Sequence, residues 1–149
     1  FITADPAGTA TFEANAKSFE DKLKALSKWV RLQLAALPKS KRILVTSHDA
    51  LGYFAKDYDF EILPVQGVST SDQPSSRKVR ELIQEIKERQ VKAIFAENIE
   101  NPKVLRQITI ETGATLGGTL YADGLGTGDA GTYLGMMRSN VTTIVGALQ

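Results

Sequence analysis

The sequence contains no cysteine and a single histidine, His48, among its 149 residues. Without cysteine the chain cannot form a disulfide, a thiolate metal site or a cysteine nucleophile. No apolar run approaches the roughly 18 to 20 residues that a membrane-spanning helix needs. Neither sign of charge predominates, since 18 basic and 17 acidic residues leave a net charge of +1. This balance argues against a nucleic-acid or membrane-surface partner, which would need a concentrated basic patch.

The motifs of common nucleotide-binding and hydrolytic folds are missing as well. There is no GxGxxG after the first strand-like run, no GxxxxGK[ST] phosphate loop and no GxSxG nucleophile elbow. The chain begins at Phe1 with neither an initiator methionine nor a signal peptide. Such a start is typical of a mature chain or of a piece cut from a longer one.

An apolar stripe predicts one long helix over residues 11–37, after an irregular lead-in over residues 1–10. Apolar residues recur at steps of three or four, at Phe12, Ala16, Phe19, Leu23, Leu26, Val30, Leu34 and Leu37. Pro38 then ends the helix. From about Thr11 to Ala36 such a helix would be roughly 39 Å long at 1.5 Å per residue, more than a compact domain of this size needs. It is either an ordinary surface helix or a strut that reaches toward a missing partner.

Residues 42–149 alternate between apolar, strand-like runs and helical patterns. The predicted strands cover residues 42–47, 60–68, 91–97 and 114–121, with helical segments between and after them. Each run is almost continuously apolar, which is typical of parallel strands that are buried on both faces. The pattern therefore predicts an α/β fold, with a four-stranded, mainly parallel sheet flanked by helices and preceded by the long helix.

Chemically useful side chains collect where the predicted strands end. His48 and Asp49 follow the first strand, Glu97 and Asn98 lie at the end of the third, and Asp123 follows the fourth. In parallel sheets, ligands bind outside the carboxyl ends of the strands. Imidazole nitrogen with carboxylate oxygen suits a divalent metal such as zinc, manganese or iron. A site of His48, Asp123 and Glu97 is incomplete, so water, another chain or a part of the protein outside this sequence would supply the remaining ligands.

Each of these residues also has a purely structural interpretation. Ser47 is expected to cap the helix that follows, and His48 is either a packing residue or the general base of a small α/β enzyme. In the same way Asp49 would mark a helix start, Glu97 would pair with Lys92 or Lys103, and Asp123 would form a turn with Gly124. Taken singly, each structural interpretation is favoured, and only the shared edge makes the metal site equally plausible.

Several segments, taken in order, resemble one known family. They are LVTSHDALGYFAKDY, VQGVSTSDQPS, KAIFAENIENPKV, ETGATLGGTLYADGL and TYLGMMRSNVTTI. Together they resemble the carboxy-terminal lobe of the zinc- and manganese-binding solute-binding proteins of ABC importers, the group called cluster A-I. The resemblance runs from about Arg42 to Leu148, and the helix before it resembles the rigid backbone helix that connects the two lobes of that family.

This resemblance implies a metal site between two lobes, with two side chains from each lobe. The ligands from this lobe would be His48, in TSHDA, and Asp123, in LYADGL, where Ala122 replaces the more usual Ser or Thr. Glu97, in FAEN, would orient the imidazole of His48. The metal would be zinc, with manganese as the alternative, because imidazole suits zinc better.

The resemblance also implies a transport role without catalysis. The protein would capture metal in the periplasm or elsewhere outside the cytoplasm, in association with the membrane, for an ABC-importer permease. The amino-terminal lobe, which carries the other two ligands, is expected to be absent, so metal binding should be weak or absent and self-association is a risk. The competing interpretation is a metal-independent protein-binding or adhesin-like module on the same α/β scaffold.

Overall fold

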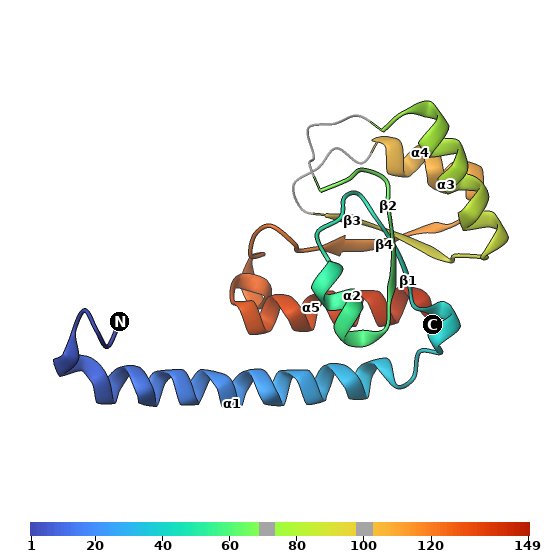
Figure 1. Cartoon of the computed structure of the whole chain (residues 1–149). Coiled ribbons are helices and arrows are strands. Elements are labelled where there is room, and N and C mark those ends of the chain that lie inside the picture. Colours follow the sequence, from blue (N-terminus) through green and yellow to red (C-terminus); the bar gives the residue numbers. More distant parts are fainter. Residues whose placement is uncertain (69–73, 98–102) are drawn as a thin grey trace.

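The structure, a computed structural model, describes residues 1–68, 74–97 and 103–149. Its strands are β1 (Ile43–Thr46), β2 (Glu61–Pro64), β3 (Ala93–Glu97) and β4 (Thr115–Leu120). They form one sheet in the order β2-β1-β3-β4, in which every neighbouring pair is parallel (Figure 1). The α/β class and the parallel sheet predicted from the sequence are therefore confirmed.

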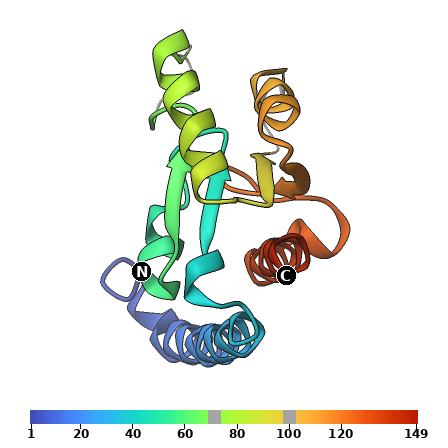
Figure 2. The same cartoon turned by 90° about the vertical axis from the view of Figure 1, so that its right-hand side faces the viewer.

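Helices cover both faces of this sheet. In the described residues they are α1 (Thr9–Leu34), α2 (Gly52–Tyr58), α3 (Ser76–Glu88), α4 (Lys103–Thr112) and α5 (Tyr133–Leu148), with short 3-10 turns at Pro6–Gly8, Lys39–Lys41 and Gly128–Gly131. α1, α2 and α5 pack on one face and α3 and α4 on the other (Figure 2). Successive strand residues point to opposite faces, so Leu44 belongs to the first core and Val45 to the second.

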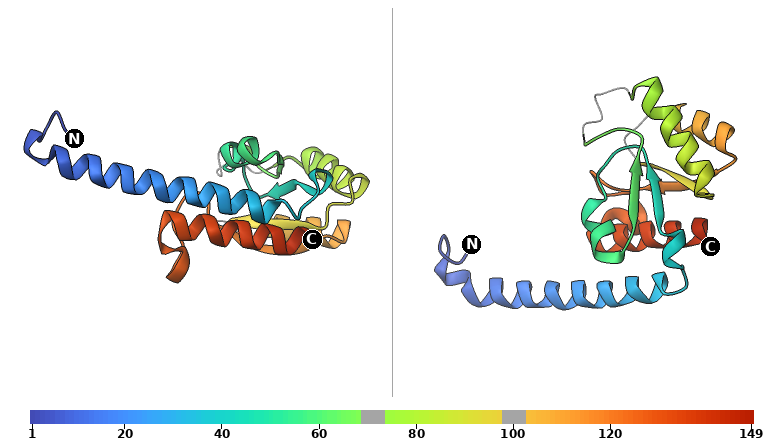
Figure 3. Two further views of the ribbon diagram at one scale, coloured as in Figure 1. Left: turned by 90° about the horizontal axis from the view of Figure 1, so that it is seen from below. Right: turned by 45° about the vertical axis from the view of Figure 1, so that its right-hand side comes forward.

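Among the described residues, it is the carboxyl-terminal half of α1 that packs against the α/β body, while its first turns contact the amino-terminal segment through Phe1 and Phe12. Leu26, Val30 and Leu34 are buried beside α5, whereas Phe19 is 47% exposed. Figure 3 shows α1 running beside α5 and then continuing past the α/β body toward the amino terminus. The first half of the predicted apolar stripe is therefore largely open to solvent. In the described part of the chain no helix, α1 included, has the length and apolarity needed to cross a membrane.

Arg42 joins the end of α1 to the α/β body. Its guanidinium donates hydrogen bonds to the carbonyl oxygens of Leu34 (2.9 Å), Leu37 (3.1 Å) and Tyr58 (3.0 Å). Carbonyls at the ends of helices lack partners within the helix, and Arg42 supplies a partner at the ends of both α1 and α2. α1 ends at Leu34 rather than at the predicted residue 37, and Leu37 stays buried just beyond the helix.

A bulge in β4 determines where this strand ends. The pairing of β3 with β4 shifts by one residue at Gly117, which has no partner of its own. A Cβ there would lie 2.7 Å from the Phe95 ring and 2.9 Å from Cβ of Ala147 on α5, so only glycine allows α5 to pack this closely. Beyond the bulge Leu120 pairs with Glu97, which brings the carboxyl ends of β3 and β4 level.

Replacing Gly117 with alanine is expected to lower the free energy of unfolding by about 1–3 kcal/mol, as overpacking of a close-packed interior does. Gly146→Ala on α5 is the matched control, because a Cβ there meets nothing within 4 Å. The control should instead raise stability by up to about 1 kcal/mol, since alanine favours the helical backbone. Urea unfolding of both variants measures the difference, and equal stabilities would contradict the close packing at Gly117.

Candidate metal centre

The carboxyl edge of the sheet brings the predicted site residues together. His48 follows β1, Glu97 is the last residue of β3, and Asp123 follows β4. Nε2 of His48 lies 3.0 Å from Oδ2 of Asp123, and Nδ1 of His48 lies 3.3 Å from Oε2 of Glu97. One imidazole therefore lies between two carboxylates that come from different strands.

This cluster is buried on one side and open on the other. The side chains of His48 and Glu97 are 4% and 1% exposed, whereas the side chain of Asp123 is 49% exposed. Glu97 thus lies behind the imidazole, in the protein interior. Nε2 of His48 faces the side from which solvent or a ligand enters.

Hydrogen bonds fix the loop that carries His48. The hydroxyl of Thr46 donates to the carbonyl oxygen of His48 at 2.8 Å. The amide of Asp49 donates to the carbonyl oxygen of Gly67 at 3.2 Å, so the chain after β1 remains paired with the chain after β2. The backbone that carries the imidazole is therefore held by hydrogen bonds within the fold.

Ser47 holds the carboxylate of Glu97. The amide of Ser47 donates to Oε2 of Glu97 at 3.0 Å, its hydroxyl contacts the same oxygen, and the Glu97 amide donates to that hydroxyl at 3.2 Å. The predicted role of Ser47 as a helix cap is wrong, because α2 begins only at Gly52, with Leu51 in the N-cap position. One feature of the sequence indicated this contact: Ser47 ends a predicted strand, so its hydroxyl was expected at the same sheet edge as Glu97.

Two buried atoms of this cluster remain without a hydrogen-bond partner among the described residues. They are Nδ1 of His48, which is poorly aligned with Glu97, and Oε1 of Glu97. Within the same ranges, no group of three or more His, Asp or Glu side chains is arranged to hold a metal ion. Zinc sites in proteins generally have at least three protein ligands. His48 Nε2 and the Asp123 carboxylate therefore do not by themselves make up such a ligand set.

The purely structural interpretations can be compared with the observed contacts. Asp49 is exposed and precedes α2, so it does not lie in the first turn of that helix. Lys92, one of the two lysines considered as partners of Glu97, donates instead to the carbonyl oxygen of Gln149 at 3.3 Å. Asn98, which the sequence places at the same edge, lies outside the described residues.

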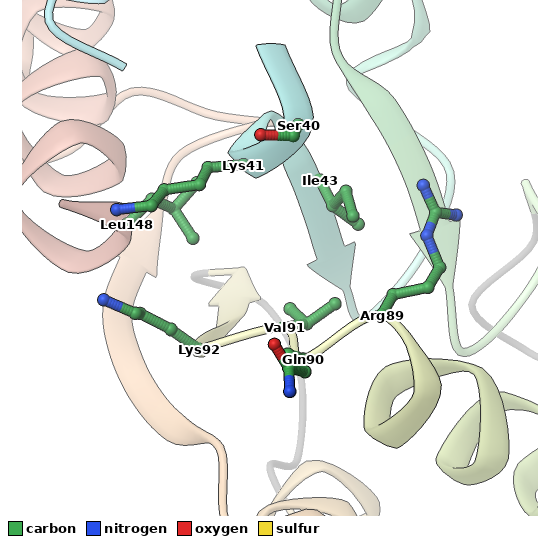
Figure 4. Close-up of a pocket in the computed structure, with 8 residues that line it drawn as sticks. All are labelled: Ser40, Lys41, Ile43, Arg89, Gln90, Val91, Lys92 and Leu148. Carbon is green, nitrogen blue, oxygen red and sulfur yellow. The ribbon is translucent and has the colours of Figure 1, made fainter. Parts of the chain in front are cut away.

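A pocket of about 310 Å³ lies at the opposite, amino-terminal edge of the sheet (Figure 4). It is lined by Ser40, Lys41, Ile43, Arg89, Gln90, Val91, Lys92 and Leu148. Lys41 and Lys92 both donate to the carbonyl oxygen of Gln149, so their ammonium groups are engaged at the end of α5. Because ligands of parallel sheets bind at the carboxyl edge, this pocket is not part of the candidate centre.

The sequence as a whole also matches a known protein family. Residues 1–147 match the family model described as ZnuA, zinc-uptake complex component A, periplasmic. The chain belongs to this family. The match includes α1 and the segments around His48 and Asp123, and it confirms the family resemblance that those segments indicated.

Several curated relatives of this ZnuA-family chain are named for the metals they bind. The chain is 38% identical to the manganese-binding lipoprotein MntA of Bacillus subtilis, over 100% of this chain and 51% of MntA. It is 37% identical to the zinc-binding protein TroA of Treponema pallidum and 36% identical to the iron-binding protein YfeA of Yersinia pestis. These two matches cover 96% of this chain and 49% and 47% of the relatives. The chain thus spans about half the length of the curated relatives it matches.

The fold agrees with that of a solved periplasmic zinc-binding protein. The structure of the periplasmic zinc-binding protein TroA from Treponema pallidum matches with a TM-score of 0.93 and 34% sequence identity. The match covers 99% of this chain and 56% of that one. Because nearly the whole chain is included, the long helix α1 as well as the sheet has a counterpart in TroA.

Proposed function

We propose that the protein captures a divalent metal ion outside the cytoplasm and delivers it to an ABC importer, with this chain as its carboxy-terminal lobe. The observation that carries the proposal is the 3.0 Å approach of His48 Nε2 to Asp123 Oδ2 at the carboxyl edge of a parallel sheet. Membership of the ZnuA family supports it. So do relatives named for manganese, zinc and iron binding.

In this proposal His48 and Asp123 are metal ligands, and the metal is cargo rather than a resident cofactor. Zinc accepts both imidazole nitrogen and carboxylate oxygen at about 2.0–2.2 Å. Zinc is the first candidate because imidazole suits it, and manganese is the second because carboxylate oxygen suits manganese. Glu97, 3.3 Å from Nδ1, would orient the ring, as carboxylates behind metal-bound histidines commonly do.

Two donors do not complete the coordination of a transition metal, which takes roughly four to six. We propose that an amino-terminal lobe supplies two more, with the predicted helix 11–37 (α1) between the lobes and residues 42–149 as the carboxy-terminal lobe. The exposed half of the α1 stripe, which includes Phe19, supports this because it offers an apolar surface to a second lobe. Without that lobe the chain would bind metal weakly or not at all, and its uncovered surfaces would favour self-association.

The proposed partner is the membrane permease of an ABC importer. The family description "periplasmic" and the name "lipoprotein" of MntA support a location outside the cytoplasm and in association with a membrane. Catalysis is not part of the proposal. Nε2 of His48 and Oδ2 of Asp123 lie close enough together to bind one cation.

Replacing Asp123 with asparagine is expected to weaken zinc binding by at least about tenfold in the chain joined to its amino-terminal lobe. Asparagine keeps the size of the side chain and one oxygen, but it loses the negative charge that attracts the cation. Asp49→Asn is the matched control, because this exposed residue at the same edge loses the same charge. Isothermal titration with Zn²⁺ measures affinity and stoichiometry, and one ion per molecule is expected.

The control separates a specific ligand from general attraction of cations to an acidic edge. If Asp49→Asn weakened zinc binding as much as Asp123→Asn, the role of Asp123 as a ligand would be contradicted. Binding of a protein partner that survives chelation and both substitutions would favour the metal-independent binding module instead.

A further inference from the structure

A side chain continues the pairing of β4 beyond its last residue. Leu120 still pairs with Glu97 of β3. At the next residue the amide of Tyr121 donates to Oδ1 of Asn140 at 2.9 Å, and Nδ2 of Asn140 donates to the carbonyl oxygen of Tyr121 at 2.8 Å. A carboxamide carries the same donor and acceptor groups as a peptide unit. Asn140 therefore extends the backbone hydrogen bonding of the strand by one position.

Asn140 makes these bonds from within the apolar core. It is 4% exposed and lies on α5 beside the buried residue Val141. Burying a carboxamide is unfavourable unless its hydrogen bonds are made, and Tyr121 provides both a donor and an acceptor. The sequence held a signal of this arrangement, since Asn140 is a polar residue among the apolar positions of the last predicted helix.

The loop that carries Asp123 is fixed at two points. Its start is held at Tyr121 by Asn140. Further along, a Cβ at Gly126 would lie 2.7 Å from the Tyr121 ring, and the amide of Gly126 donates to the carbonyl oxygen of Ala130 at 3.0 Å. Asp123 lies between these points and only two residues from Tyr121, a span of at most roughly 7 Å. A displacement of the Tyr121 backbone would therefore displace the carboxylate of Asp123.

We propose that Asn140 is a positioning residue for Asp123. By fixing the backbone of Tyr121, it holds the Asp123 carboxylate against Nε2 of His48 before a metal ion arrives. Such preorganisation strengthens binding, because less conformational freedom is lost when the ion is bound. The inference rests on the proposed function, since it takes Asp123 to be a metal ligand.

The test compares Asn140→Leu with Val141→Ala in the chain joined to its amino-terminal lobe. Asn140→Leu removes both hydrogen bonds while keeping the branched shape and the number of side-chain heavy atoms, whereas Val141→Ala lowers stability from the neighbouring buried position without removing a hydrogen bond. Zn²⁺ affinity is measured by competition with a chelator, at a temperature where the variants are folded. We expect Asn140→Leu to lower the affinity about 10- to 100-fold and Val141→Ala to leave it unchanged.

The absorption spectrum of bound Co²⁺ is a second readout, because it reports the geometry of the ligands rather than stability. Asn140→Asp is the alternative variant if Asn140→Leu does not fold. It keeps an oxygen that can accept from the Tyr121 amide, but it places a carboxylate oxygen against the Tyr121 carbonyl oxygen, where Nδ2 of Asn140 donated a hydrogen bond. We expect both Asn140 variants to change the spectrum and to weaken Zn²⁺ binding. The parental affinity and spectrum in a folded Asn140 variant would overturn the inference.

His48→Ala in the same series distinguishes failure of this inference from failure of the proposed function. If His48→Ala loses Zn²⁺ while the Asn140 variants bind it normally, only the role of Asn140 is wrong. If His48→Ala also binds Zn²⁺ normally, the proposed metal site itself is wrong, and the positioning of Asp123 for metal is wrong with it.

Discussion

Zinc binding is expected to fall by at least about 100-fold when His48 is replaced with alanine in the chain joined to its amino-terminal lobe. The substitution removes the only imidazole of the sequence, and with it the nitrogen donor of the proposed site. It also leaves the buried Glu97 without the ring that lies 3.3 Å from its carboxylate. Isothermal titration and chelator competition with Zn²⁺ measure the loss.

Two further variants test whether the loss of zinc binding is specific to His48 and whether the donor atom at this position determines the metal preference. Tyr53→Ala also removes a ring from the segment after His48, but Tyr53 is 90% exposed, so zinc binding should not change. His48→Glu keeps a metal donor, and it should shift the preference from zinc toward manganese because carboxylate oxygen suits manganese. Parental zinc affinity in His48→Ala would contradict the assignment of His48 as a ligand.

The largest effect on folding is expected from Arg42→Ala, which should lower the free energy of unfolding by about 3 kcal/mol. A hydrogen bond from a charged donor contributes about 1.5–3 kcal/mol, and Arg42 donates three, to Leu34, Leu37 and Tyr58. Because these hydrogen bonds are only partly buried, water can bind the three carbonyl oxygens in the variant. The expected loss of stability is therefore smaller than the sum of the three individual contributions. Urea unfolding followed by circular dichroism measures it.

Arg42→Lys should recover only part of this stability, since lysine has one nitrogen where the guanidinium of arginine reaches three carbonyls. Arg77→Ala is the matched control. It removes the same side chain from an exposed ion pair with Glu81 on α3, and such a pair contributes at most about 0.5 kcal/mol. If Arg42→Ala lowered the free energy of unfolding no more than Arg77→Ala does, the attachment of α1 to the α/β body would not depend on Arg42.

The sheet could be predicted from the sequence mainly because its two inner strands, β1 and β3, are buried, nearly continuous apolar runs. All four residues of β1 are buried, and such runs differ clearly from the helical stripes between them. β2 was less well predicted, as residues 60–68 instead of Glu61–Pro64. It is an edge strand that pairs only with β1, and Pro64, which has no amide hydrogen, is its last residue.

The predicted cluster of site residues followed from a rule of topology. Parallel strands end at one edge of the sheet, so His48, Glu97 and Asp123 were expected near one another, and the observed distances show that they are. The roles of Ser47 and Asn140 depend instead on pairs of polar groups far apart in the sequence. The helical pattern can mark Asn140 as a polar residue among apolar positions, but it does not identify the partner, because each pair is fixed by the packing of one element against another.

The order of the strands links the candidate centre to the folding of the whole sheet. β3 lies between β1, which precedes His48, and β4, which precedes Asp123, so the two donors meet only when all three strands are in place. Contacts between such distant parts of a chain form slowly during folding. In the proposed site a bound metal ion would therefore stabilise β1, β3 and β4 together, by an amount that grows with the logarithm of its concentration. On the proposed function, loss of the ion would leave this three-stranded unit less stable and more sensitive to proteases.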